Sequence, residues 1–80
     1  MFIPLDTQMY RLGVQIGECV VTNDRERAER IKAQARALVA DVHSHAIKRT
    51  ARLCYVDGIA DGKIDARRDQ LKRERELATA

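Results

Sequence analysis

Aromatic side chains are scarce in this sequence, which has two tyrosines, one phenylalanine and no tryptophan among its 80 residues. Large aromatic residues usually supply much of the surface that a small domain buries. A chain of this size makes one domain at most, and it buries only about 60% of the surface that its unfolded form exposes. We therefore expect marginal stability for a monomer unless a partner chain covers further apolar surface.

Long apolar runs are also absent, and no stretch approaches the roughly 20 apolar residues of a membrane-spanning helix. The first residues, MFIPLDTQMYR, have neither the basic segment nor the apolar run of a signal peptide. We therefore expect a cytoplasmic protein. The two cysteines, Cys19 and Cys54, form no CxxC pattern, and in a reducing compartment such residues usually act as small buried apolar side chains.

A strong excess of charge of one sign is missing as well. Fifteen basic residues stand against twelve acidic ones, and the net charge of +3 is spread through the chain. Nucleic-acid-binding domains usually concentrate positive charge more than this. The composition therefore does not favour a nucleic-acid ligand.

Apolar residues between Leu5 and Val21 recur at helical spacing, which predicts a first helix over residues 5–21. A β-hairpin is the competing interpretation for residues 13–21, which are rich in glycine and β-branched residues. We prefer the helix because no polar residue separates Cys19, Val20 and Val21, as strand alternation would require. Gly13 and Gly17 would then lie on one side, where another helix can approach closely.

A second helix is predicted over residues 24–56, because no glycine or proline interrupts that stretch after the capping residues Thr22, Asn23 and Asp24. It would be roughly 50 Å long at 1.5 Å per residue. One side of it carries a row of apolar residues: Ala28, Ile31, Ala35, Leu38, Val39, Val42, Ala46, Leu53 and Val56. A weaker row lies on another flank: Ala33, Ala40, Ile47, Ala51 and Cys54.

The predicted fold is all-α, a single domain over residues 1–80 in which one long central helix forms a hairpin with the first helix. A short third helix over residues 65–78 is almost entirely polar. Since two apolar flanks need two neighbours, we predict a homodimer, a helical bundle in which the long helices pair in antiparallel fashion. Its interface would consist of Ile31, Ala35, Leu38, Val42, Ala46 and Leu53. The alternative is a monomer whose last helix folds back over the long one.

The stretch VDGIADGKIDARR, residues 56–68, has the outline of an EF-hand calcium loop, but two ligand positions do not fit. Ile59 stands where a side-chain oxygen is needed, and Arg68 stands where a glutamate closes the metal cage. We therefore predict no metal and no cofactor. The stretch is instead expected to be a turn, in which Gly58 ends the long helix and Asp65 caps the next one.

Catalytic patterns are equally weak, and we expect a protein that is not an enzyme. His43 and His45 are two residues apart, so on a helix they point in nearly opposite directions and cannot share a metal ion. A Cys54 nucleophile would need a nearby histidine and a substrate pocket, which a thin helical hairpin does not offer.

The remaining signal is a polar patch on the second predicted helix, next to the apolar row. Arginine and tyrosine are typical of binding hot spots because they combine large contact area with directed hydrogen bonds. The patch comprises His45, Lys48, Arg49, Arg52 and Tyr55. It is either an ordinary solvated face or a partner-binding surface.

In size, in Ala/Arg-rich composition and in architecture, the whole chain resembles the small helical accessory proteins of phages and prophages, which include antiactivators and anti-CRISPR inhibitors. The resemblance implies a homodimeric inhibitor or regulator that binds and occludes a host protein. It includes no diagnostic motif and assigns no functional residue.

The alternative is a small nucleic-acid-binding transcriptional regulator. In this interpretation residues 58–65 form the turn of a helix-turn-helix, and basic residues of the last helix contact phosphates. These residues are Arg67, Arg68, Lys72, Arg73 and Arg75. Acidic neighbours and a connection longer than the usual three or four residues weigh against it.

Overall fold

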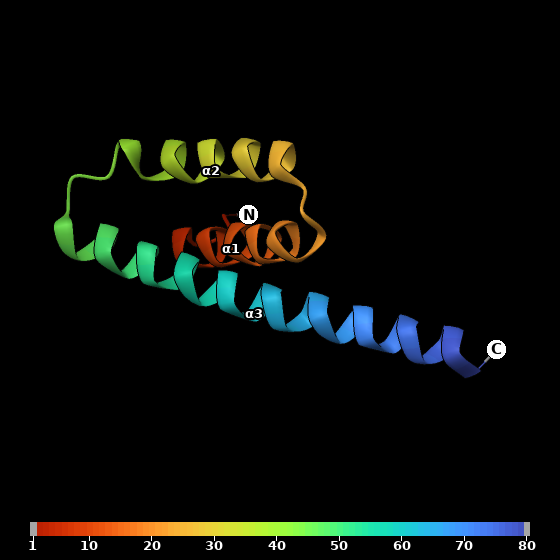
Figure 1. The fold of residues 1–80 in the computed structure, drawn as a ribbon. Helices are drawn as coiled ribbons and strands as arrows, with labels where there is room; N and C mark the ends of the chain where they lie inside the picture. The colour runs from red at the N-terminus through yellow and green to blue at the C-terminus, as the bar shows by residue number, and fades with distance from the viewer. Residues whose placement is uncertain (1, 80) are drawn as a thin grey trace.

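The computed structural model describes residues 2–79, which form three helices (Figure 1): α1 (Leu5–Thr22), α2 (Arg25–Ala40) and α3 (His45–Thr79). The predicted all-α class and the hairpin of the first two helices are confirmed. Helix α1 lies between α2 and α3, and the C-terminal part of α3 extends beyond both (Figure 1). The molecule is therefore elongated, with extents of 54 × 24 × 21 Å.

The first predicted helix is confirmed, and residues 13–21 are helical rather than a hairpin. Asp6 does not cap this helix, since the cap position is Pro4 and has no side-chain hydrogen bond. The turn that follows has Asn23 in the left-handed conformation at φ 59°. A carboxylate oxygen of Asp24 then accepts a hydrogen bond from the Arg27 backbone N–H at 3.2 Å, which caps α2.

The single helix predicted over residues 24–56 is wrong, because α2 ends at Ala40 and α3 begins at His45. The four residues between them, 41–44, are Asp, Val, His and Ser, all of which have modest helix propensity. Ser44 also provides a new start, since its hydroxyl oxygen accepts a hydrogen bond from the Ile47 backbone N–H at 3.3 Å. No glycine or proline is needed for this break.

The turn predicted over residues 58–65 is also wrong, because this stretch is an uninterrupted part of α3. Neither Gly58 nor Gly62 has a positive φ, and Asp65 lies inside the helix rather than at a cap. The third helix predicted over residues 65–78 is the C-terminal part of α3. The EF-hand-like pattern thus corresponds to no loop.

Four glycines hold α1 and α3 unusually close together. A Cβ atom on Gly13 would collide with the Tyr55 carbonyl oxygen and lie 3.0 Å from the Gly58 Cα. A Cβ on Gly17 would lie 2.6 Å from the Lys63 backbone nitrogen, and one on Gly62 would collide with the Val14 carbonyl. The close approach predicted for Gly13 and Gly17 is confirmed, and its partner is the second glycine pair.

The apolar core is small and lies along α1, where α2 and α3 pack on different sides of it. One cluster is built around Met9, Ala35 and Ala51, and the other around Ile16, Cys19 and Ile31. The backbones of α2 and α3 hardly approach each other, but side chains from all three helices meet in both clusters.

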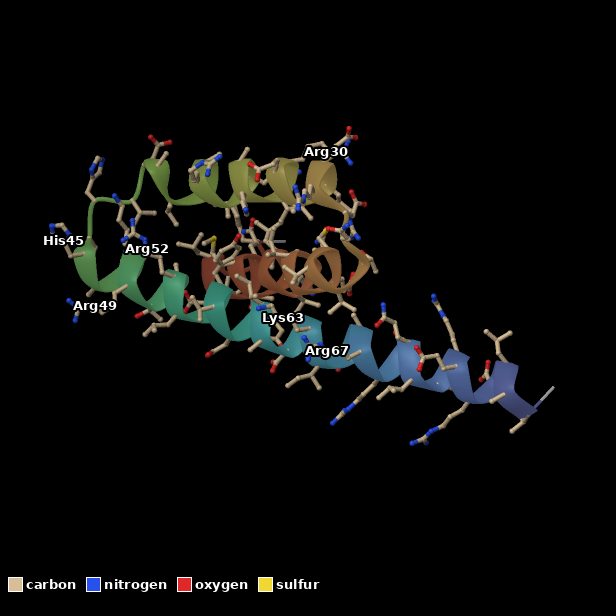
Figure 2. All side chains as sticks on the ribbon, viewed as in Figure 1. Arg30, His45, Arg49, Arg52, Lys63 and Arg67 are labelled. Atoms are coloured by element: carbon tan, nitrogen blue, oxygen red, sulfur yellow. The ribbon has the colours of Figure 1, made fainter. Side chains whose placement is uncertain are left out.

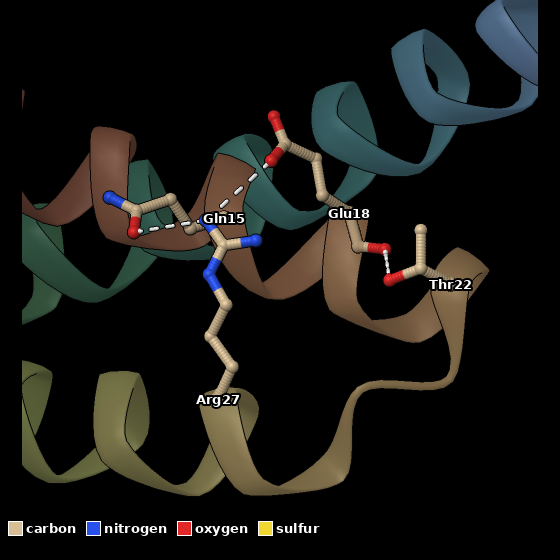
Figure 3. Close-up of polar contacts among 4 residues, drawn as sticks. All are labelled: Gln15, Glu18, Thr22 and Arg27. Carbon is tan, nitrogen blue, oxygen red and sulfur yellow. Dashed lines mark hydrogen bonds and ion pairs between the residues drawn. The ribbon is translucent and has the colours of Figure 1, made fainter.

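Arg27 links the start of α2 to α1 at the edge of this core (Figure 3). Its guanidinium donates to the Gln15 side-chain oxygen at 3.5 Å and lies 3.8 Å from a carboxylate oxygen of Glu18. The Thr22 hydroxyl donates to the Glu18 carbonyl at 2.9 Å. Because these groups are partly exposed, they orient the α1–α2 turn more than they stabilise it.

Substitution of Gly62 tests the helix crossing. We expect Gly62→Ala to lower the free energy of unfolding by about 1–3 kcal/mol, since the added methyl group must push two backbones apart. Gln70→Ala, on the exposed continuation of α3, is the matched control and should leave stability unchanged or slightly raised. Thermal and urea unfolding followed by circular dichroism measure both. If the two variants had the same free energy of unfolding, the close contact of α3 with α1 at Gly62 would be contradicted.

Candidate protein-binding surface on α3

The side of α3 that faces away from the core carries a row of exposed apolar side chains. Leu53 and Val56 are each 58% exposed, and Ile64 and Leu71 are 50% and 55% exposed. Their spacing of three, four or seven residues, with Ala60 between them, places them on one side of the helix. The buried residues of α3 lie on the opposite side: Ala51, Gly58, Gly62 and Ala66.

Two shallow depressions hollow this outer face and meet at Val56. The first, of about 450 Å³, is lined by His45, Lys48, Arg49, Arg52, Leu53 and Val56. The second, of about 430 Å³, is lined by Val56, Ile59, Ala60, Lys63, Ile64 and Arg67. We call the combined surface the outer face of α3.

The charged groups that line these two depressions are Lys48, Arg49, Arg52, Lys63 and Arg67, all of which are basic, and His45 lies beside them. Figure 2 shows four of them, Arg49, Arg52, Lys63 and Arg67, spread along α3 after His45 at its start. Within the part of the chain that the structure describes, no ion pair involves any of these six side chains: His45, Lys48, Arg49, Arg52, Lys63 and Arg67. An apolar row with basic side chains along one flank is thus open to solvent, and Asp57 and Asp61 lie along its other flank.

Two acidic residues of α3 lie on the flank of the helix next to α1, beside the outer face, with which their depression shares Ala60. Asp57 and Asp61 join Asp6 of α1 in a depression of about 440 Å³. The Tyr10 hydroxyl donates a hydrogen bond to the Asp61 carboxylate at 2.5 Å. This bond, together with burial and nearby carboxylates, raises the pKa of Tyr10. The charges of α3 are therefore sorted by side.

Four of the five residues of the predicted polar patch lie together in the first depression. Tyr55 does not join them, because its ring packs against the core on the side of α3 that faces α2. Burial raises the pKa of Tyr55, while Lys32 and Arg36 of α2 act in the opposite direction.

The predicted dimer interface is divided by the break between α2 and α3. Ile31 and Ala35 are buried within the chain, and Leu38 packs against the same core. Val42 is in the connection, Ala46 is exposed in the first turn of α3, and Leu53 is on the outer face. These six residues therefore form no continuous surface, and the rod whose pairing they were to mediate does not exist.

The basic residues assigned to the nucleic-acid alternative are exposed on the free end of α3: Arg67, Arg68, Lys72, Arg73 and Arg75. The helix-turn-helix at residues 58–65 is wrong, since there is no turn at that position. Among residues 2–79, no cluster of three potential metal ligands occurs. Within the same described range, no helix combines the length and apolar character needed to cross a membrane.

Sequence reasoning missed the extension of the outer face beyond Val56. Lys63 and Ile64 fall within the predicted turn, so neither the predicted polar patch nor the predicted interface includes them. Their spacing from Leu53 and Val56 is helical. A helix that continues through Gly58 and Gly62 joins the parts of the outer face before and after Val56. The pattern of glycines four residues apart, repeated at Gly13 and Gly17 and at Gly58 and Gly62, was the available signal.

Comparisons with known proteins identify no relative of this chain. No family model, no curated protein and no solved structure matches it.

Alkaline titration tests the surroundings of the two tyrosines. Because the pKa of each is raised, both should ionise above pH 10.0 in the folded protein and at their ordinary value after unfolding. The protonated forms favour folding, so stability should fall as pH rises through the folded-state values. Near-ultraviolet absorbance measures ionisation, and Tyr10→Phe isolates Tyr55. Ionisation of either folded-state tyrosine at or below its ordinary pKa would contradict this arrangement.

Proposed function

We propose that the protein is a non-enzymatic interaction module that binds and occludes another protein through the outer face of α3. The supporting observation is that this face leaves large apolar side chains exposed, outside the core, with basic side chains along one flank that form no ion pair within the described chain. Binding and occlusion of this kind is the function of a phage-encoded inhibitor or regulator of a host protein. This proposal agrees with the resemblance in size, composition and architecture described above.

The outer face has the chemistry of a binding surface. Burying the exposed halves of Leu53, Val56 and Ile64 contributes about 2–4 kcal/mol in total, which does not reach the roughly 8 kcal/mol of a micromolar complex. The arginines supply the difference when carboxylates of the partner pair with them, and they also steer its approach. Affinity should therefore depend on both the apolar row and its border.

The length of the outer face suits occlusion. From His45 to Arg67 it extends roughly 33 Å along one straight helix. A partner bound along this distance has a comparable strip of its own surface covered. The proposed inhibition is therefore steric and requires no chemical step.

Substitutions on the outer face test this function. An affinity-tagged chain should retain one host protein in stoichiometric amount, and Leu53→Glu or Arg49→Glu should each reduce the retained amount at least about tenfold, the effect of 1.4 kcal/mol. Quantitative pull-down followed by mass spectrometry measures the loss. Both residues are exposed, so helicity should stay unchanged.

Two matched controls accompany these variants. Leu77→Glu makes the same change at a side chain that is 78% exposed near the end of α3. Arg30→Glu makes the same charge reversal on α2, away from the outer face (Figure 2). Both should retain the partner normally. Loss of the partner in the controls as well, or its retention by all variants, would remove support for the outer face.

Nucleic-acid binding remains the second candidate, because the free end of α3 carries five exposed basic residues. The acidic side chains Asp69, Glu74 and Glu76 on the same segment oppose contact with a polyanion. Random-sequence duplex DNA is the probe. Binding that weakens steeply between low and physiological salt, and that Arg68→Glu reduces, would favour this candidate. No binding at low salt would eliminate it.

A further inference from the structure

A second apolar hollow lies between α2 and α3, with α1 as its floor. It has a volume of about 370 Å³. Apolar side chains from all three helices line it: Met9, Ile16, Ala35, Val39, Tyr55 and Ile59. We call it the α2–α3 groove; it shares Arg52 and Ile59 with the outer face of α3, and its other wall belongs to α2.

The groove exists because α1 packs against both neighbours while the backbones of α2 and α3 hardly approach each other. The glycines hold α3 close to one side of α1, and the side chains of Ile31 and Ala35 seat α2 on another side. Met9 and Ile16 of α1 form the floor and are only 2% and 4% exposed, so the accessible apolar lining is mainly the half-buried Val39, Tyr55 and Ile59. A helix laid along the groove would contact both walls, as neighbouring helices do in a four-helix bundle.

The border of the groove is cationic on both sides. Lys32 and Arg36 of α2 and Arg52 of α3 line it, and no acidic residue does so within the described range. Lys32 pairs with exposed Glu29 at 3.3 Å, whereas Arg36 and Arg52 form no ion pair in residues 2–79. Figure 2 shows Arg52 on the side of α3 that faces α2.

The dimensions of the groove match two turns of helix. Its walls run from Lys32 to Val39 on α2 and from Arg52 to Ile59 on α3, about 10 Å each at 1.5 Å per residue. A helix docked in a groove typically inserts side chains at positions i, i+4 and i+7, which span the same distance. The open top of the groove also suits a helix, which keeps its other side in solvent.

We propose that the α2–α3 groove binds a short acidic amphipathic helix of another protein as a fourth helix. Its apolar side chains rest on the half-buried Val39, Tyr55 and Ile59, and its flanking carboxylates face Arg36 on one side and Arg52 on the other. This site adjoins the outer face of α3 but has a wall on α2, and it does not depend on the function proposed for that face.

A second copy of this chain is a poor occupant because its free helical surfaces are themselves basic. The exposed end of α3 carries five basic residues from Arg67 to Arg75 and three acidic ones, Asp69, Glu74 and Glu76. Helix α2 also has more basic than acidic residues. Either surface would place positive charge against the cationic border, whereas an acidic helix places opposite charges there.

Two synthetic peptides test the proposal. Both form helices with leucine at positions i, i+4 and i+7, and the flanking positions carry glutamate in one peptide and lysine in the other. Fluorescence anisotropy of the labelled peptides with the full chain measures binding. We expect the glutamate peptide to bind at least about tenfold more tightly than the lysine peptide at low salt, with the difference shrinking as salt increases.

Variants of the groove identify where the peptide binds. Arg36→Glu, at an exposed position, should weaken the glutamate peptide about tenfold or more, since it reverses one side of the border. Arg30→Glu, on α2 outside the groove, is the matched charge control and should leave binding unchanged. Leu53→Glu should also leave it unchanged, which separates this site from the outer face.

Several results would overturn the proposal. These are absence of binding by both peptides, equal binding of the two, or binding that Arg36→Glu leaves intact. Light scattering adds a further check on the occupant. A dimer that dissociates on Arg36→Glu would show that a second copy fills the groove, and the proposed acidic partner would then be wrong.

Discussion

The contact of backbone on backbone between α1 and α3 is the constraint on which the other features depend. Each glycine inside a helix costs about 1 kcal/mol relative to alanine, and four of them occur here. That cost is offset because the two helices approach closely enough for van der Waals contact along a chain that has almost no large aromatic residues. A core made of Met9, Ile16 and a few alanines can be sufficient only because the backbones themselves fill the space.

This close crossing also determines what is left uncovered. Because glycines face α1, the larger apolar residues of α3 are located elsewhere on the helix, and several of them point into solvent. Tight packing on one side of α1 also keeps the backbone of α3 apart from that of α2, which leaves a groove between these two helices. The outer face and the α2–α3 groove therefore both follow from the close packing of α1 against α3 through glycines.

Sequence reasoning predicted the helical class, the extent of α1 and the turn at Asn23, because each has a local cause in apolar spacing or capping. The errors lay where local and tertiary preferences conflict. Gly58 and Gly62 have the local preferences of a turn, and only the presence of Gly13 and Gly17 across the interface makes a helix the better conformation. The break after Ala40 is the opposite case, since a run of weak helix formers ends the helix without any strong breaker.

Four of the predicted patch residues nevertheless lie together, because His45 to Arg52 fall within one helix both in the prediction and in the structure. Tyr55 was wrongly assigned to the patch because its burial depends on where α2 packs, and no local pattern in α3 specifies that position.

The arrangement of charge on α3 gives Arg49 and Arg52 little role in the stability of the chain. Within the described chain the ion pairs involve Arg27 and Lys32 of α2, whereas Arg49 and Arg52 have none. Basic groups gathered without counterions repel one another and so contribute nothing to folding. Asp57 and Asp61 do not pair with them, because these acids lie on the other flank of the outer face, next to α1. In the proposed function, carboxylates on the acidic surface of a partner supply the counterions that the basic flank lacks within the described chain.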